Sequence, residues 1–135
     1  MTANLNEQQP KEQTDMTPYI DGFVIPIAQD KLEAYRAMAE KAAAIWKEHG
    51  ALDYVEAVGD DLDVKDQVPF PKLASAQDGE TVVLAYIVFE SRAQRDAVNA
   101  KVMADPRIQA MCDPANPPFD FKRMAYGGFR VIVQA

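Results

Sequence analysis

The chain has 135 residues, of which 48% are hydrophobic and 26% charged, and its formal net charge is -7 at pH 7. This length and composition suit one globular domain. The acidic balance argues against a nucleic-acid partner, and no apolar run approaches the roughly 20 residues of a membrane span. One histidine and one cysteine, Cys112, exclude an internal disulfide and a zinc site of the usual kind, so we expect no metal and no cofactor.

The first 16 residues differ in composition from the rest of the chain. They are rich in Gln, Asn, Glu and Thr and carry almost nothing apolar, which predicts a disordered tail before a single domain over residues 17–135. They also lack the basic and apolar regions of a signal peptide, so we expect a cytoplasmic protein.

A strand and a helix open the predicted domain. Tyr19–Ile27 is apolar on both alternating faces, which is typical of an interior strand. Asp30 followed by Glu33 has the spacing of a capping box and predicts a helix that ends near Gly50. Its expected buried stripe consists of Leu32, Tyr35, Met38, Ala39, Ala42 and Trp46.

Two further strands should follow, separated by a long loop. In Leu52–Val58 the charged residues Asp53 and Glu56 interrupt the apolar ones, which favours an edge strand. Residues 60–80 show no clear periodicity and read as a loop. Thr81–Phe89 is again apolar on both faces, so it should be an interior strand that is covered from two sides.

The last part of the chain predicts a helix and a strand. Ser91 with Gln94 repeats the capping-box spacing, and this second helix should stop at Asp105, before a proline. Ile108 and Met111 then suggest a further short helical turn. Residues 124–133 should form the final strand, with a probable bulge at the glycine pair of residues 127 and 128.

The resulting order, β-α-β-β-α-β, predicts an α+β fold of the ferredoxin-like kind with a four-stranded antiparallel sheet. Right-handed crossovers place the first and third strands in the middle, which agrees with their apolar faces. Two helices can cover only one face of such a sheet. The other face would be an exposed apolar patch, so we expect a homodimer formed by sheet-to-sheet contact.

Three stretches carry a family resemblance: Tyr19-Ile-Asp-Gly-Phe23, Ala51-Leu-Asp-Tyr-Val-Glu56 before Gly59-Asp-Asp61, and Pro118-Phe-Asp-Phe-Lys-Arg-Met-Ala-Tyr-Gly-Gly-Phe129. They resemble the YbaA-like bacterial family of unknown function, over essentially Met16 to Ala135. The resemblance implies a dimeric α+β barrel, in which two ferredoxin-like sheets pack face to face. It implies no established reaction. Met16, where the likeness begins, is an alternative start of the protein.

Asp21 is an acid within an apolar interior strand and should be paired, because a lone buried carboxylate is costly. If the last strand runs antiparallel beside the first, Arg130 falls approximately opposite it. We therefore expect a structural ion pair between Asp21 and Arg130, with a register that the expected bulge makes uncertain by a residue or two.

Any ligand site should lie where the second and third strands pair. A register that sets Tyr54 opposite Tyr86 would bring Tyr54, Glu56, Leu84 and Tyr86 to one face, with His49 at its border. Tyr54, Glu56 and Tyr86 are then the candidate ligand-binding residues, and Glu56, Tyr86 and His49 the candidate catalytic ones. The alternative is an ordinary core face in which the tyrosines find backbone partners, and we prefer it.

Other polar clusters favour structural roles over chemical ones. His49 could serve as a general base or haem ligand, but its place at a helix end suits a cation that stabilises exposed carbonyls. The acids Asp60, Asp61, Asp63 and Asp66 lack the spacing of a calcium loop. Lys122 and Arg123 could clamp an anion, although such a pair is more often a surface or interface feature.

Two functions remain open from the sequence. One is a small-molecule enzyme or binding protein that binds or transforms an aromatic or carboxylic metabolite, a reading that depends on analogy of fold alone. The other is a non-catalytic homodimer that acts in protein interactions or in a stress response. The expected partners are a second copy of the chain and a small molecule, without nucleic acid or membrane.

Overall fold

The computed structural model describes residues 17–111 and 115–135, so the predicted disordered tail and Cys112 lie outside the described residues. No helix in this part of the chain is both long and apolar enough to cross a membrane. In chain order the elements are β1 (Tyr19–Ala28), η1 (Gln29–Lys31), α3 (Leu32–Glu48), β2 (Asp53–Val58), α4 (Phe70–Leu73), β3 (Glu80–Phe89), α5 (Arg92–Met103), α6 (Pro106–Met111), η2 (Phe121–Arg123) and β4 (Ala125–Arg130).

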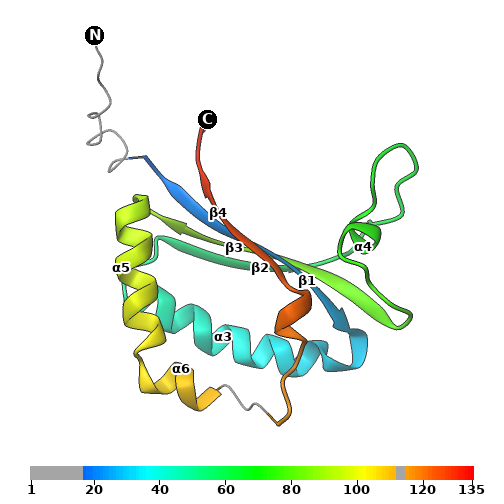
Figure 1. The fold of residues 1–135 in the computed structure, drawn as a ribbon, viewed down its shortest axis with the longest axis horizontal. Helices are drawn as coiled ribbons and strands as arrows, with labels where there is room; N and C mark the ends of the chain where they lie inside the picture. The colour runs from blue at the N-terminus through cyan, green and yellow to red at the C-terminus, as the bar shows by residue number, and fades with distance from the viewer. Residues whose placement is uncertain (1–16, 112–114) are drawn as a thin grey trace.

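The four strands form one antiparallel sheet in the order β2-β3-β1-β4 (Figure 1). The two strands that are apolar on both faces, β1 and β3, lie in the middle, and the charged strand β2 lies at an edge. The predicted ferredoxin-like α+β fold is confirmed, including its strand order.

Helices cover one face of the sheet, whereas the opposite face is only partly covered: Pro26 and Val82 are buried there, and Leu84 and Phe129 are exposed. Figure 1 shows α3, α5 and α6 on the same side, which we call the helix face. The opposite side, the open face, carries the alternate side chains of each strand. By the pairing register, its apolar members are Ile20, Val24, Pro26, Ala28, Val55, Ala57, Val82, Leu84, Tyr86, Val88, Ala125 and Phe129.

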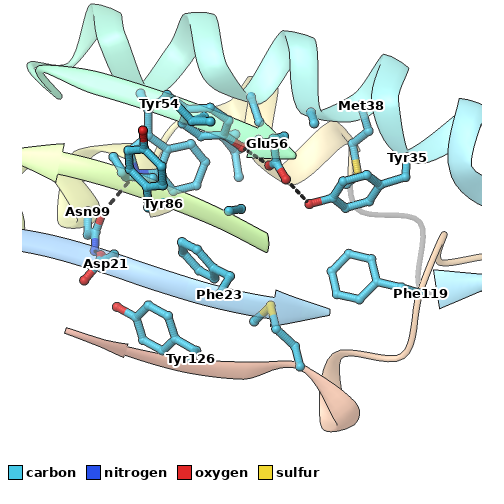
Figure 2. A pocket seen from close by; sticks show the side chains of 18 of the residues that line it. Asp21, Phe23, Tyr35, Met38, Tyr54, Glu56, Tyr86, Asn99, Phe119 and Tyr126 are labelled. Carbon is cyan, nitrogen blue, oxygen red and sulfur yellow. Dashed lines mark hydrogen bonds between the residues drawn. The ribbon is translucent and has the colours of Figure 1, made fainter. Parts of the chain in front are cut away.

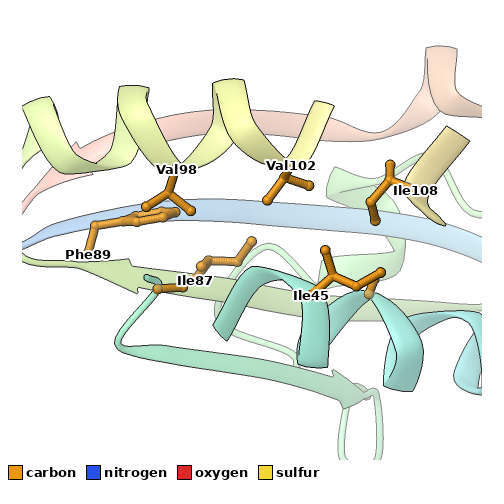
Figure 3. Packing of buried hydrophobic residues seen from close by; sticks show 8 residues of the cluster. Ile45, Ile87, Phe89, Val98, Val102 and Ile108 are labelled. Carbon is orange, nitrogen blue, oxygen red and sulfur yellow. The ribbon is translucent and has the colours of Figure 1, made fainter. Parts of the chain in front are cut away.

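Buried side chains on the helix face form two clusters. One packs α5, α6 and the end of α3 against β3, and its members include Phe89 and Val102, which have no exposed surface (Figure 3). The other packs α3 against β1 and β3 through Ile25, Ile27 and Ala39. The predicted α3 stripe is broadly right, although Ile45 is buried and was not in it.

The two capping predictions have different outcomes. Ser91 caps α5, since its Oγ accepts a hydrogen bond from the Gln94 backbone N–H at 3.1 Å. The helix ends at Met103, earlier than the expected Asp105. At the start of α3 the capping box is wrong: Asp30 falls inside the 3-10 turn η1, and Lys31 occupies the N-cap without a side-chain bond.

Two local predictions near strand ends need correction. The loop over residues 60–80 contains the short helix α4, which four residues are too few to reveal by periodicity. The bulge predicted in β4 is absent, because its register with β1 is unbroken. Gly128 makes a close contact instead: a Cβ there would lie 2.6 Å from the hydroxyl oxygen of Tyr19, so a larger residue would displace that ring.

Asp21 is paired, but not with Arg130. Its side chain is 1% exposed, and its carboxylate accepts hydrogen bonds from Arg95 at 2.7 Å and from Asn99 at 3.1 Å, both from α5. The unbroken register places Gly128 opposite Asp21 and Arg130 opposite Tyr19. The predicted partner was wrong because a helix, rather than the neighbouring strand, supplies the charge.

The Arg95→Met substitution should lower the free energy of unfolding by about 3 kcal/mol, because it leaves the buried Asp21 without its counter-charge. Arg130→Met removes the same functional group from an exposed position, and its effect should stay within about 0.5 kcal/mol. Urea unfolding at one protein concentration measures both values. Equal effects of the two substitutions would contradict this assignment.

Candidate functional site

A cavity of about 490 Å³ lies on the helix face, between the sheet and α3 (Figure 2). Its walls draw on both core clusters and on the segment before β4, which contributes Phe119, Phe121 and Met124. This volume falls within the usual range of small-molecule sites. The lining is mainly apolar and aromatic, with polar groups at only a few points.

The sequence explains why the core is hollow here. The buried face of α3 carries Ala39 and Ala42, and β3 presents Ala85 across from them. Three methyl groups occupy positions where larger side chains would meet, so helix and sheet leave space between them. Methionines complete part of the wall, and their flexible thioethers adapt to a bound molecule more readily than branched side chains do.

Glu56 is the central polar group of the cavity. Its Oε1 accepts a hydrogen bond from the Tyr35 hydroxyl at 2.6 Å, and its Oε2 accepts one from the Tyr54 hydroxyl at 2.9 Å. Figure 2 shows the two tyrosines on either side of the carboxylate, one from α3 and one from β2. Two donors of this kind suit the ionised form of Glu56 and hold it in one orientation.

Burial and hydrogen bonding act against each other on this acid. Burial raises the pKa of Glu56 above its ordinary value, and the hydrogen bonds from Tyr35 and Tyr54 oppose part of that rise. Burial, together with the neighbouring carboxylate, raises the pKa of both tyrosines far above their ordinary range. The two hydroxyls therefore remain protonated donors at neutral pH.

A second polar region borders the cavity at Asp21. Asn99, which donates to Asp21, also accepts a hydrogen bond from the Trp46 indole N–H at 3.0 Å. Arg95 donates to the Tyr126 hydroxyl at 3.1 Å as well as to Asp21. Each carboxylate oxygen of Asp21 has a partner, so this region is a compensated structural network.

This arrangement equips Glu56 to accept a hydrogen bond or to exchange a proton with a molecule in the cavity. The carboxylate is oriented, burial raises its pKa above the ordinary value, and most of its surroundings are apolar. Within residues 17–111 and 115–135 no three His, Cys, Asp or Glu side chains are grouped so as to hold a metal ion.

The structure brings together only part of the site predicted from sequence. Tyr54 and Glu56 do share the cavity, but Tyr54 lies opposite Ile87 and not Tyr86. By strand alternation the side chains of Leu84 and Tyr86 project from the open face, and Tyr86 is 37% exposed. At its position in β3, Tyr86 still borders the cavity (Figure 2). A shift of one residue in register moves every side chain of a strand to the other face.

His49 does not border the cavity. It forms the C-cap of α3, and its Nε2 lies 2.8 Å from a carboxylate oxygen of Asp105. Hydrogen bonds from Arg107, and to a lesser extent from His49, hold the pKa of Asp105 well below its ordinary range. This cluster joins α3 to the start of α6. The His49 side chain pairs with an acid, and not with the helix-end carbonyls that its expected structural role required.

The basic pair before β4 has a structural role. Arg123 donates two hydrogen bonds of 2.8 Å to the two carboxylate oxygens of Glu80, and a third of 2.9 Å to the Ser75 carbonyl. These contacts join η2 to the start of β3. Lys122 is exposed, and only its backbone N–H bonds to Asp120, so the pair is not arranged as an anion clamp.

Three contributors to this region were missed from sequence, although signals for them existed. Tyr35 was placed in the buried stripe of α3, and a buried tyrosine hydroxyl needs a partner. Arg95 and Asn99 lie on the α5 face that also carries the buried Val98 and Val102. Polar residues on an inward helical face indicate a buried polar partner, which here is Asp21.

Replacing Glu56 by Gln tests the raised pKa through stability. Because the folded protein holds the Glu56 proton more tightly than the unfolded chain, protonation stabilises the fold fully below the unfolded pKa of about 4.3. That contribution is lost as pH rises through the folded pKa. The free energy of unfolding of wild type relative to Glu56→Gln should therefore fall as pH rises above about 4.

Glu80→Gln is a control for which the pH dependence of stability should have the opposite sign. The hydrogen bonds from Arg123 lower the pKa of Glu80 to about 2, so its stabilisation is present above the unfolded pKa and is lost as pH falls. Urea unfolding across this pH range measures both differences. The same pH slope in both pairs would show that the Glu56 pKa is not raised.

Comparisons with known proteins agree with the fold and identify the family. The family model described as "Protein of unknown function (DUF1428)" matches residues 18–121. The uncharacterized protein YbaA of Escherichia coli K12 is 44% identical over 115 residues, which are 85% of this chain and 97% of that protein. YbaA of Shigella flexneri matches to the same extent.

Two solved structures share the fold at low sequence identity. A NIPSNAP family protein with unknown function from Agrobacterium tumefaciens superposes with a TM-score of 0.54 at 14% identity, over 86% of this chain and 89% of that one. A dimeric ferredoxin-like protein from an uncultured marine organism gives 0.52 at 12%, over 87% and 99%. By its motifs, its family model and its identity to YbaA, the chain belongs to the YbaA-like DUF1428 family of proteins of unknown function.

Proposed function

We propose that the protein is a homodimer that binds a small, mainly aromatic molecule in the cavity of each subunit. The observation that carries this proposal is Glu56, a carboxylate held by two tyrosine hydroxyls within a largely apolar cavity of about 490 Å³. An apolar hollow with a few oriented polar groups is the usual design of a small-molecule site.

The walls favour an aromatic ligand over a carboxylic one. Phe23, Trp46, Phe119 and Tyr126 offer rings to a planar molecule, and Figure 2 shows Phe23, Phe119 and Tyr126 across the cavity from Glu56. Glu56 and Asp21 are both acids, and the described residues that line the cavity include no lysine or arginine, so a ligand carboxylate would meet like charge there. With a bound molecule, Glu56 would accept a hydrogen bond or transfer a proton, and acid–base catalysis is the reaction class that this permits.

A purely structural dimer or interaction module is the second candidate, and the apolar open face favours it. The cavity argues for ligand binding in addition. A hollow core reduces stability relative to a filled one, and a half-buried acid reduces it further. A protein that works only through its outer surface gains nothing from either feature.

Dimer formation through the open face is supported by its composition. Leu84 is 46% exposed on a central strand, and Phe129 is 61% exposed on β4. Large exposed apolar side chains on one flat sheet are typical of a surface that is covered by a partner. The ferredoxin-like solved structure that shares this fold is described as dimeric, and we extend that assembly to this chain.

Light scattering after gel filtration should give twice the 15.0 kDa mass of the chain at micromolar concentration. Leu84→Glu buries a charge at the centre of the proposed interface and should shift the protein to a monomer. Leu52→Glu is the matched control, because Leu52 is 48% exposed, close to the 46% of Leu84, but precedes β2 and is not an open-face residue. A monomeric wild type, or dissociation by both substitutions alike, would overturn the dimer proposal.

Neutral aromatic compounds should raise the melting temperature of the wild-type protein in a thermal-shift screen. Tyr54→Phe removes one hydroxyl from the cavity and reorients Glu56, so the affinity for a stabilising compound should fall about tenfold. Tyr19→Phe removes the same hydroxyl from a residue that does not line the cavity, and the affinity should stay unchanged. Equal affinities of wild type and both variants would place the binding site elsewhere.

A further inference from the structure

Glu56 differs from the other buried or half-buried carboxylates in having no cationic partner. In the described ranges these carboxylates are Asp21, Glu56, Glu80 and Asp105. Arginine side chains pair with Asp21, Glu80 and Asp105 at 2.7 to 2.8 Å. Among these residues Glu56 alone is held only by neutral hydroxyls. The fold thus supplies a counter-charge to three of its four shielded acids and leaves the fourth, in the cavity, without one.

The bonds to Glu56 leave room for a further donor. Each carboxylate oxygen can accept about two hydrogen bonds, and Tyr35 and Tyr54 take one on each oxygen. The hydroxyls favour the anion, but they do not neutralise its charge. A cationic nitrogen with N–H donors would do both, and burial makes such a pairing stronger than it is in water.

The aromatic lining also favours a positive charge. The faces of aromatic rings carry negative potential and attract cations that lie within about 6 Å of the ring centre. Two ring pairs flank the acid: Tyr35 with Phe119, whose centroids are 5.5 Å apart, and Trp46 with Tyr54, whose centroids are 5.9 Å apart. An ammonium group beside Glu56 would therefore lie near aromatic rings as well as against a carboxylate.

The charged surroundings agree with this assignment. Behind Glu56 a groove between α3 and β2 is lined by Glu33, Arg36 and Glu40. Arg36 lies 3.8 Å from Glu40. Two acids and one arginine together contribute one net negative charge. The whole chain has a formal net charge of -7, which attracts cations and repels anions as they approach.

We propose that the ligand of the cavity is an organic monocation, a protonated amine with an aromatic or bulky apolar body, whose nitrogen pairs with Glu56. This inference rests on the proposed small-molecule function and specifies its ligand class. The apolar body occupies the hollow that Ala39, Ala42 and Ala85 leave. The ammonium supplies the counter-charge that no side chain in the described ranges provides to Glu56.

Isothermal titration of the full chain with three matched probes tests this inference: 2-phenylethylamine, 2-phenylethanol and phenylacetate. At pH 7.5 they present a cation, a neutral hydroxyl and an anion on similar bodies. The amine should bind wild type about tenfold or more tightly than the alcohol, and phenylacetate should bind most weakly. In Glu56→Gln the preference for the amine should disappear, while affinity for the alcohol changes less than about twofold.

Two control variants separate the charge of Glu56 from other effects. Glu40→Gln removes a charge from the outer groove and should keep the preference for the amine. Tyr54→Phe keeps the Glu56 charge, so it should retain that preference even where both affinities fall. Circular dichroism and urea unfolding establish that each variant is folded before titration.

The outcomes distinguish this inference from the function on which it depends. If the alcohol or phenylacetate binds wild type as tightly as the amine, or if Glu56→Gln keeps the preference, the amine inference is overturned and aromatic binding in the cavity stands. If no probe binds at millimolar concentration and the thermal-shift screen also finds no neutral aromatic ligand, both proposals are overturned.

Discussion

The central strands β1 and β3 carry apolar side chains on both faces of the sheet, whereas the helices α3, α5 and α6 cover only one face. This imbalance governs the rest of the architecture. On the helix face, α3 and α5 bury two clusters and leave a cavity between sheet and helix. On the open face the exposed Leu84 and Phe129 favour a second copy of the sheet. A cavity on one side of the sheet and an exposed apolar surface on the other are the two features on which the proposed dimer with a ligand site in each subunit depends.

Much of the fold follows from local patterns in the sequence. Two-sided apolar runs identified the central strands, interrupting charges identified the edge strand β2, and Ser91 identified the start of α5. These signals are strong because each depends on a period or a spacing within a few residues. The short helix α4 and the 3-10 turn at Asp30 were not predicted, because neither spans enough residues to show a period.

The candidate site was harder to predict because it depends on register and on distant contacts. A loop of some twenty residues, not a tight hairpin, joins β2 to β3, so turn geometry did not specify which residues pair. The observed register differs from the expected one by one residue. It places the Tyr86 side chain on the open face, whereas Tyr54 and Glu56 face α3. The partners of Asp21 lie more than 70 positions away in α5, a separation at which one sequence carries only a weak signal.

The two donors to Glu56 come from different layers of the molecule. Tyr35 belongs to α3 and Tyr54 to β2, so the carboxylate spans the contact between helix and edge strand. A displacement of α3 away from β2 would break one of these bonds and weaken the stabilisation of the anion. Proton affinity at Glu56 and the position of α3 are thus thermodynamically linked, and a molecule that changes either one must change the other. The position of α3 therefore affects how readily Glu56 releases its proton.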